Sequence, residues 1–341
     1  MKNLITDVPG VLVGNAEDMR AATGATVAIF DGGAVASVVT TGGAPGSRMV
    51  TSLEPEMMSG QVDAIVLSGG SVYGLDAAGG TTAALCSQGR GATFGGITVP
   101  LAVQAILFDL TNGGDKPWLR EPMKERPPYW DLGRDAALAA GPTFALGTAG
   151  AGVGATTAGL KGGLGSASAR TSQGFTVGAL VAVNAVGSAT IGTGRHFWAG
   201  AYERDGEFGG LGWPAKLPSD AMALRFKGQP APVTATTIAM VATDAVLSKA
   251  ACKRLAIMAN DGLSKALRPV HAPNDGDTVF AAATGRMKSP ADAGLPPIMT
   301  ELGTVAADCL ARAVARGVYK ATALPFPNAL PDWKTRFGAK R

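Results

Sequence analysis

The threonines at the entry to one apolar strand are the residues of this chain whose position best suits covalent chemistry. The run Thr234-Ala235-Thr236-Thr237-Ile238-Ala239-Met240-Val241 follows a loop that contains Pro230 and Pro232. A chain cut at such a place exposes an N-terminal threonine, whose hydroxyl is the nucleophile and whose own amine is the general base. Threonine is also common at strand starts for packing reasons, and composition alone favours a purely structural role for this segment.

Lys161 is the second residue of interest, because it is the only charged side chain between Asp135 and Arg170. An ammonium among small and apolar residues is costly to bury. Lys161 therefore lies either exposed in its glycine-flanked turn or desolvated in an active site with a lowered pKa.

The acidic pair Asp275-Gly276-Asp277 precedes an apolar strand that begins near Thr278. It reads either as a simple turn or as two carboxylates that orient and balance an ammonium, whether a lysine or a new N-terminus. No further acidic residues follow at EF-hand spacing, so a calcium loop is not expected.

Several other chemistries lack the residues they need. With only His196 and His271, a Ser-His-Asp triad or a histidine-rich metal site has little material, and both histidines are expected to be structural. The run from Gly150 to Ala155 imitates a dinucleotide-binding fingerprint, but no acidic residue follows before Glu203. We therefore expect no metal and no cofactor, and a base other than imidazole if the chain is a hydrolase.

The elements that must position these residues follow from periodicity and turn signals. A helix capped by Ser248 is expected to run to about residue 267, with apolar residues near helical spacing. Low charge and continuous apolar strands favour sheets covered on both faces, as in a helix–sheet–sheet–helix arrangement. The expected strands are 26–30 and 35–40, separated by a turn at Asp31-Gly32-Gly33, then 64–67, 143–146, 178–183, 188–191, 236–243 and 278–283; the other expected helices are 73–88 and 299–319, followed by an extended tail after Leu324.

Composition further limits the kind of protein that this chain can be. The 341 residues carry only 16% charged side chains and a formal charge of +4 without a Lys/Arg cluster, so nucleic-acid binding is not expected. Three scattered cysteines, Cys86, Cys252 and Cys309, fit a reducing compartment, and no secretory signal is visible. The longest uncharged run, 136–160, is too rich in glycine and alanine for a membrane span. A cytoplasmic protein of more than one subunit is expected.

Motifs along nearly the whole chain resemble one known family. They are Ile5-Thr6-Asp7-Val8-Pro9-Gly10-Val11, Gly42-Gly43-Ala44-Pro45-Gly46, Leu67-Ser68-Gly69-Gly70-Ser71, Tyr73-Gly74-Leu75-Asp76-Ala77-Ala78, Val183-Asn184-Ala185-Val186-Gly187, Thr236-Thr237-Ile238, Val241-Ala242-Thr243-Asp244-Ala245 and Asp275-Gly276-Asp277-Thr278. The sequence resembles the self-cleaving aminopeptidases, which include the L-aminopeptidase/D-esterase, β-aminopeptidases and the endo-type 6-aminohexanoate (nylon) oligomer hydrolase. The Asp-Gly-Asp form brings it closest to the last branch.

The resemblance implies an α+β fold with four αββα layers in a single domain, 1–341. It implies self-cleavage between Ala235 and Thr236 into chains 1–235 and 236–341, which stay together in a homo-oligomer, with a tetramer favoured. The implied substrate is a small peptide or an oligoamide. Position by position, Thr236 is the nucleophile, Lys161 the lysine beside it, Asn184 the oxyanion contact, Asp275 and Asp277 the orienting acids, and Phe108 and Tyr73 part of the substrate pocket.

Two positions depart from that pattern. Ala235 stands where close relatives carry Asn or Gly, which bears on the rate of self-cleavage. Phe108 stands where some members have a tyrosine hydroxyl, which leaves more of the oxyanion contact to Asn184 and backbone N–H groups. Two alternatives follow: an acyltransferase of the ornithine acetyltransferase type, and an unprocessed, non-catalytic homologue.

Overall fold

The computed structural model describes residues 1–228, 234–287 and 295–338, so Pro230 and Pro232 of the loop before Thr236 lie outside the described residues. The strands are β1 (Val11–Asp18), β2 (Thr23–Thr40), β3 (Ser47–Arg48), β4 (Val62–Ser68), β5 (Ala92–Phe94), β6 (Ile97–Val99), β7 (Ala102–Ile106), β8 (Gly163–Arg170), β9 (Thr176–Asn184), β10 (Thr236–Thr243) and β11 (Thr278–Ala283). The helices are α1 (Ala77–Ser87), α2 (Tyr129–Leu138), α3 (Lys249–Ala266), α4 (Pro296–Lys320) and α5 (Trp333–Phe337).

One long strand joins two stacked sheets. The first part of β2 pairs with β1 and β4, whereas its last residues pair with β11. The register shifts between Ile29 and Ala34, where Gly32 and Gly33 have φ of +82° and +78°. Glycine adopts these left-handed angles without the clash that a side chain brings. The expected turn at Asp31-Gly32-Gly33 between two separate strands is therefore wrong: the glycines bend a continuous strand and carry it from one sheet to the other.

The strand order along the path is β3-β7-β4-β2-β11-β10-β9-β8, with β1 beside β2. In the second sheet β10 lies between β9, to which it is antiparallel, and β11, to which it is parallel. From Ile238 to Thr243, β10 pairs on both sides. Its first residue, Thr236, pairs on the β9 side, where it lies opposite Asn184.

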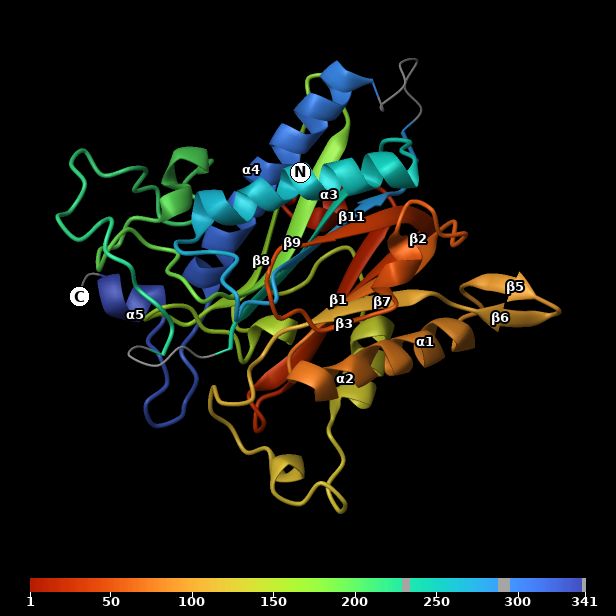
Figure 1. The fold of residues 1–341 in the computed structure, drawn as a ribbon, viewed down its shortest axis with the longest axis horizontal. Helices are drawn as coiled ribbons and strands as arrows, with labels where there is room; N and C mark the ends of the chain where they lie inside the picture. The colour runs from red at the N-terminus through yellow and green to blue at the C-terminus, as the bar shows by residue number, and fades with distance from the viewer. Residues whose placement is uncertain (229–233, 288–294, 339–341) are drawn as a thin grey trace.

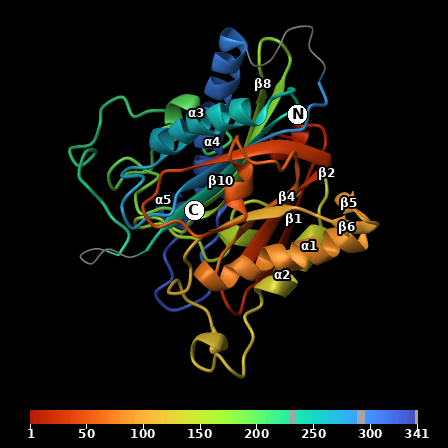
Figure 2. The same ribbon diagram turned by 45° about the vertical axis from the view of Figure 1, so that its right-hand side comes forward.

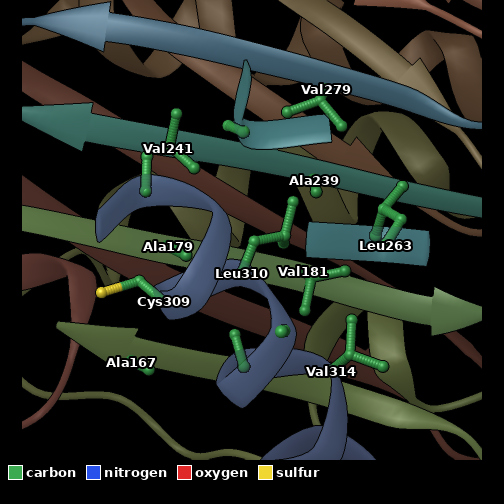
Figure 3. Packing of buried hydrophobic residues seen from close by; sticks show 14 of the residues in the cluster. Ala167, Ala179, Val181, Ala239, Val241, Leu263, Val279, Cys309, Leu310 and Val314 are labelled. Carbon is green, nitrogen blue, oxygen red and sulfur yellow. The ribbon is translucent and has the colours of Figure 1, made fainter. Parts of the chain in front are cut away.

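Alternating side chains of these strands build the layers. From β10, Ile238 and Met240 enter the cluster between the two sheets, whereas Ala239 and Val241 face the other way, toward α3 and α4. Figure 3 shows Leu310 of α4 above this outer face of the second sheet. The first sheet packs its outer face on α1 and α2 in the same manner. The layers are thus helix, sheet, sheet and helix, as expected from the sequence (Figures 1 and 2).

Most of the expected elements are present. Residues 236–243 and 278–283 form β10 and β11 with the expected bounds, and the Ser248 side chain caps α3 by accepting from the N–H of Ala251. Two expected strands are wrong. Residues 143–146 pair with no strand, and 188–191 make only isolated bridges, to Arg268 and Phe197. The helix expected from residue 73 begins as a 3-10 turn, Ser71–Asp76, and becomes α-helical only at Ala77.

The C-terminal tail returns to its own chain and is not simply extended. Trp333 of α5 is buried, stacks on Phe197 with ring centroids 5.7 Å apart, and donates its indole N–H to the carbonyl of Arg195. Just before it, the carbonyl of Pro331 accepts from the backbone N–H of Lys161. The tail therefore helps to hold the segment that carries Lys161. Within the described residues, no helix is both long and apolar enough to cross a bilayer.

Candidate active site

Thr236 lies at the first position of β10 with only 2% of its surface exposed. Its hydroxyl donates a hydrogen bond to the carbonyl oxygen of the preceding residue, Ala235. The N–H of Gly276 donates to the same oxygen at 3.2 Å. The peptide bond before Thr236 thus has a hydroxyl beside its carbonyl group and an N–H that polarises that group.

Gly276, between the two acids, has to be a glycine because neighbouring atoms lie very close to its Cα. A Cβ atom on Gly276 would lie 2.8 Å from Thr236 Oγ1 and 2.8 Å from the carbonyl oxygen of Ala44. Both contacts are far inside ordinary van der Waals separation. Only glycine at this position lets the Asp-Gly-Asp segment lie against the Thr236 hydroxyl.

Asp277 fixes the backbone next to Thr236. Its Oδ1 accepts from the N–H of Thr237 at 2.8 Å, and its Oδ2 accepts from the backbone N–H of His271 at 3.2 Å and lies 2.8 Å from His271 Nδ1. Nε2 of His271 lies 3.1 Å from the amide nitrogen of Asn260, so Nε2 is the acceptor and Nδ1 carries the proton toward Asp277. His271 has the structural role expected of it, one step removed from Thr236.

Asp275 has a different environment. It is 1% exposed, and its backbone forms a parallel bridge with Ala235. Burial and the charge of Asp277 raise the pKa of the Asp275 carboxyl, while the ammonium of Lys227 and the N–H groups of Ala272 and Val186 act in the opposite direction. Its Oδ1 has no hydrogen-bond partner among the described residues. Asp275 is therefore a buried carboxyl group beside the bond that precedes Thr236, and burial favours its protonated form.

Lys161 is buried and desolvated, not exposed in its glycine-flanked turn, and its part in an active site stays a prediction. It is 1% exposed, and its Nζ donates to the carbonyls of Gly152, Ala155 and Gly162 at 2.8, 2.8 and 2.9 Å. Three acceptors match the three hydrogens of the ammonium form. Burial, reinforced by the positive charge of Lys227, lowers the pKa of Lys161 to about 7, and the carboxylate of Asp109 opposes this shift. Lys161 therefore titrates near neutral pH.

Asn184 joins the site to a residue that the sequence did not single out. Its Oδ1 accepts from Lys227 Nζ at 2.6 Å and from the N–H of Thr156 at 3.0 Å. Its Nδ2 donates to the carbonyl of Phe108 at 2.8 Å. Donors around the oxygen and an acceptor beside the nitrogen fix the orientation of this amide. Among the described residues Phe108 is the one partner of Nδ2, so the second N–H of this amide is unused there.

Among the buried charges of the described residues, Lys227 and Asp109 act on Lys161, and sequence reasoning missed both. Lys227 is 7% exposed, although it stands in a glycine- and proline-rich loop that reads as surface. Asp109 accepts from the Thr23 hydroxyl at 2.7 Å and from the N–H of Gly70 at 2.8 Å. The Ser68-Gly69-Gly70-Ser71 motif was the one sequence feature related to Asp109. Its Gly69 has to be glycine because a Cβ there would lie 2.0 Å from the Asp109 carboxylate.

The two residues expected in the substrate pocket lie on different segments, and their part in substrate binding stays a prediction. Phe108 is half-buried and contributes its carbonyl to Asn184. Tyr73 is half-buried against the cluster between the first sheet and helices α1 and α2. A groove of about 1110 Å³ lies elsewhere, between the bend of β2 and the β5–β6 hairpin, and shares no lining residue with the site. In the uncut chain the site residues are buried together.

The layered architecture places the chain among proteins of the Ntn-hydrolase fold. A β-aminopeptidase of Burkholderia sp. superposes with a TM-score of 0.69 at 22% identity, covering 99% of this chain and 92% of that one. The L-aminopeptidase D-Ala-esterase/amidase of Ochrobactrum anthropi, described as a variant of the Ntn-hydrolase fold, gives 0.65 at 21% identity, with coverages of 97% and 90%.

The chain belongs to peptidase family S58, whose family model matches residues 3–329. An uncharacterized aminopeptidase of Mycobacterium tuberculosis is 41% identical over 341 residues, 94% of each chain. A 6-aminohexanoate-oligomer endohydrolase of Kocuria sp. is 30% identical over 326 residues, 90% of this chain and 84% of the relative. The protein is therefore an enzyme that hydrolyses peptide or amide bonds, and the resemblance noted in its sequence is confirmed.

Proposed function

We propose that this chain is the precursor of a self-processing amide hydrolase whose nucleophile is Thr236. The observation that carries this proposal is the placement of the Thr236 hydroxyl against the carbonyl of Ala235, with the Gly276 N–H on the same oxygen. Attacking group, target carbonyl and a donor to the developing oxyanion are thus assembled within one strand entry and one turn.

In the self-cleavage step, Oγ1 of Thr236 attacks the carbonyl carbon of Ala235. The C–N bond between the two residues breaks, the nitrogen takes up the hydroxyl proton, and an ester remains on Oγ1. Water then hydrolyses this ester, which yields a carboxylate at Ala235 and a free amine and hydroxyl at Thr236. Ala235 is fully buried beside Thr236, so the new chain end at Ala235 has to move away before a substrate can reach the Thr236 hydroxyl.

In the cut enzyme the free amine of Thr236 takes the hydroxyl proton while Oγ1 attacks the substrate amide, and an acyl-enzyme forms. The lowered pKa of Lys161 and the acceptor capacity of Asp275 keep that amine in a suitable protonation state. Asn184 Nδ2 has an N–H to offer to the oxyanion, a contact whose loss typically costs about 3 kcal/mol in the barrier.

The two fragments would stay associated after cleavage. Fragment 236–341 contains β10, which pairs with β9 from Thr236 to Thr243, and β11, which pairs with β2. It also contains α3 and α4, whose apolar faces complete the buried cluster on the second sheet. Separating the fragments would expose that whole core to water.

The substrate class we propose is a small peptide or an oligoamide, hydrolysed without a cofactor. Its support is the naming of relatives as aminopeptidases and as 6-aminohexanoate-oligomer endohydrolases. A panel of amino-acid p-nitroanilides and 6-aminohexanoate oligomers separates these, and acetyl-ornithine with glutamate as acceptor identifies an acyltransferase instead.

The direct test is intact-mass analysis of the purified protein. Wild type should consist of fragments 1–235 and 236–341, and Thr236→Ala should give only the full chain without amidase activity. Thr237→Val is a matched control, because the neighbouring hydroxyl has no hydrogen-bond partner among the described residues and should be dispensable. An active wild type that stays uncut would refute the proposal.

A further inference from the structure

Lys227 is a buried cation for which the proposed mechanism has no use. Its Nζ lies 2.6 Å from Asn184 Oδ1, and its backbone N–H donates to the carbonyl of Val186 at 2.8 Å. It belongs to the segment that leads into Thr236 from the N-terminal side. Burying an ammonium is costly, and an aliphatic side chain could fill the same space. Its retention at this point therefore calls for an explanation.

The two residues that Lys227 faces bracket the bond before Thr236. Asn184, which accepts from the ammonium, is the ladder partner of Thr236. Asp275, whose carboxyl is influenced by the charge of Lys227, is the bridge partner of Ala235. Lys227 thus acts on both sides of the peptide bond to be cut, through one amide and one carboxylate.

The balance of charge around Lys227 changes when the chain is cut. In the uncut chain Asp275 is buried, and its Oδ1 has no partner among the described residues. The charge of Lys227 also lowers the pKa of Asp109 and of Lys161. Cleavage adds a new amine at Thr236, in the strand next to Asp275. A positive charge is therefore needed from elsewhere only before cleavage.

We propose that Lys227 is a positioning residue for self-cleavage: its ammonium holds the Asn184 amide in place and offsets Asp275 until the amine of Thr236 exists. This inference rests on the proposed function. After cleavage the new amine replaces Lys227 as the cation beside the acidic pair. Turnover by the cut enzyme then depends on Lys227 only through the orientation of Asn184, which the Thr156 N–H and the Phe108 carbonyl also hold.

The test measures self-cleavage and turnover separately. Wild type, Lys227→Met and Lys227→Arg are made by pulsed cell-free synthesis, and conversion of the full chain to fragments is followed at several pH values from about 6 to about 9. Hydrolysis is then normalised to the amount of cut protein by intact mass. Lys216→Met, which removes an exposed lysine upstream of the same loop, is the control.

The raised pKa of Asp275 leaves its carboxyl uncharged at acid pH. We therefore expect Lys227→Met to slow self-cleavage by about tenfold or more at neutral pH, the size of effect seen when one contact that positions reacting groups is lost. Burial lowers the pKa of Lys227 to about 7, with Asp109 and Asp275 opposing the shift. The ratio of the wild-type rate to the Met rate should therefore fall as pH rises and the wild-type lysine loses its charge. Lys227→Arg cannot lose its charge, so its ratio to Met should stay constant.

Normalised turnover of the cut Lys227 variants should fall much less than their rate of self-cleavage, because two other groups also hold Asn184. Equal cleavage rates for wild type and Lys227→Met, a ratio that does not change with pH, or an equal loss of normalised turnover would overturn the inference. If Lys227→Met does not fold, the Arg variant decides, since it must cleave and must lack the decline above neutral pH that wild type shows. Failure of wild type to cut at all would instead refute the proposed function, so the two failures are distinct.

Discussion

Gly276→Ala tests whether the turn between the two acids is shaped around the Thr236 hydroxyl. The added Cβ would lie 2.8 Å from Thr236 Oγ1 and 3.1 Å from its Cγ2. Ordinary contact begins at 3.4 Å, so the hydroxyl or the turn must move by about 0.6 Å. The carbonyl of Ala44, also 2.8 Å from the new atom, limits how far the turn can give.

A displacement of that size should slow self-cleavage on the order of tenfold, because a misplacement of about 1 Å can cost about a hundredfold in rate. This corresponds to about 1.4 kcal/mol in the activation free energy. Overpacking should also lower the free energy of unfolding by about 1–3 kcal/mol, which leaves a folded protein.

The assay follows conversion of full chain to fragments after pulsed synthesis. Thermal unfolding of each variant, with Thr236 retained so that the contact with the new Cβ is present, is the check on folding. Gly60→Ala is the matched control, because a Cβ there meets nothing within 4 Å. A folded Gly276→Ala protein that cuts itself as fast as wild type would show that the turn does not position the nucleophile.

Three further predictions concern stability, measured by urea unfolding of the uncut Thr236→Ala protein. The pKa of Lys161 is about 7 in the folded protein, against an ordinary value of 10.5. The destabilisation caused by burying its charge is therefore complete below pH 7 and disappears as pH rises toward 10.5. Between these pH values the unfolding free energy should rise by about 1.4 kcal/mol per pH unit more than in Lys161→Met, and equal slopes would contradict the buried placement. Asp277→Ala leaves two backbone N–H groups without their acceptor and should cost about 2–6 kcal/mol, whereas a loss below about 1 kcal/mol would be too small for that role. Trp333→Ala removes a buried ring and should cost about 3–5 kcal/mol, and an unchanged midpoint would mean that the tail does not hold the Lys161 segment.

The layered arrangement was predictable because the strands that form it have a clear local sequence pattern. In β10 and β11, β-branched and apolar residues run without interruption between turn signals, so both were placed from the sequence with the bounds they have in the structure. The bend of β2 was not, since Asp31-Gly32-Gly33 is also the signature of a hairpin. Only the partners of the flanking segments decide between the two, and those partners are remote in sequence.

The site was predictable to a different degree. The sequence motifs identified Thr236, Lys161, Asn184 and the two acids as candidates. In the structure, Asp277, Asn184 and Asp275 contact the start of β10 or the residue before it. Lys227 could not be found, because its loop context is that of an exposed lysine. Its burial arises from a partner 43 residues away in sequence. Long-range contacts of this kind leave no local pattern.

The most direct test of the central claim is to locate a trapped acyl group. The purified enzyme is treated with an ester probe that acylates quickly and deacylates slowly, and the modified residue is mapped by mass spectrometry. The label should be found on Thr236, at the N-terminus of fragment 236–341, and only in cut molecules. Stoichiometric labelling of another residue, or of an uncut chain that is active, would contradict an N-terminal threonine nucleophile.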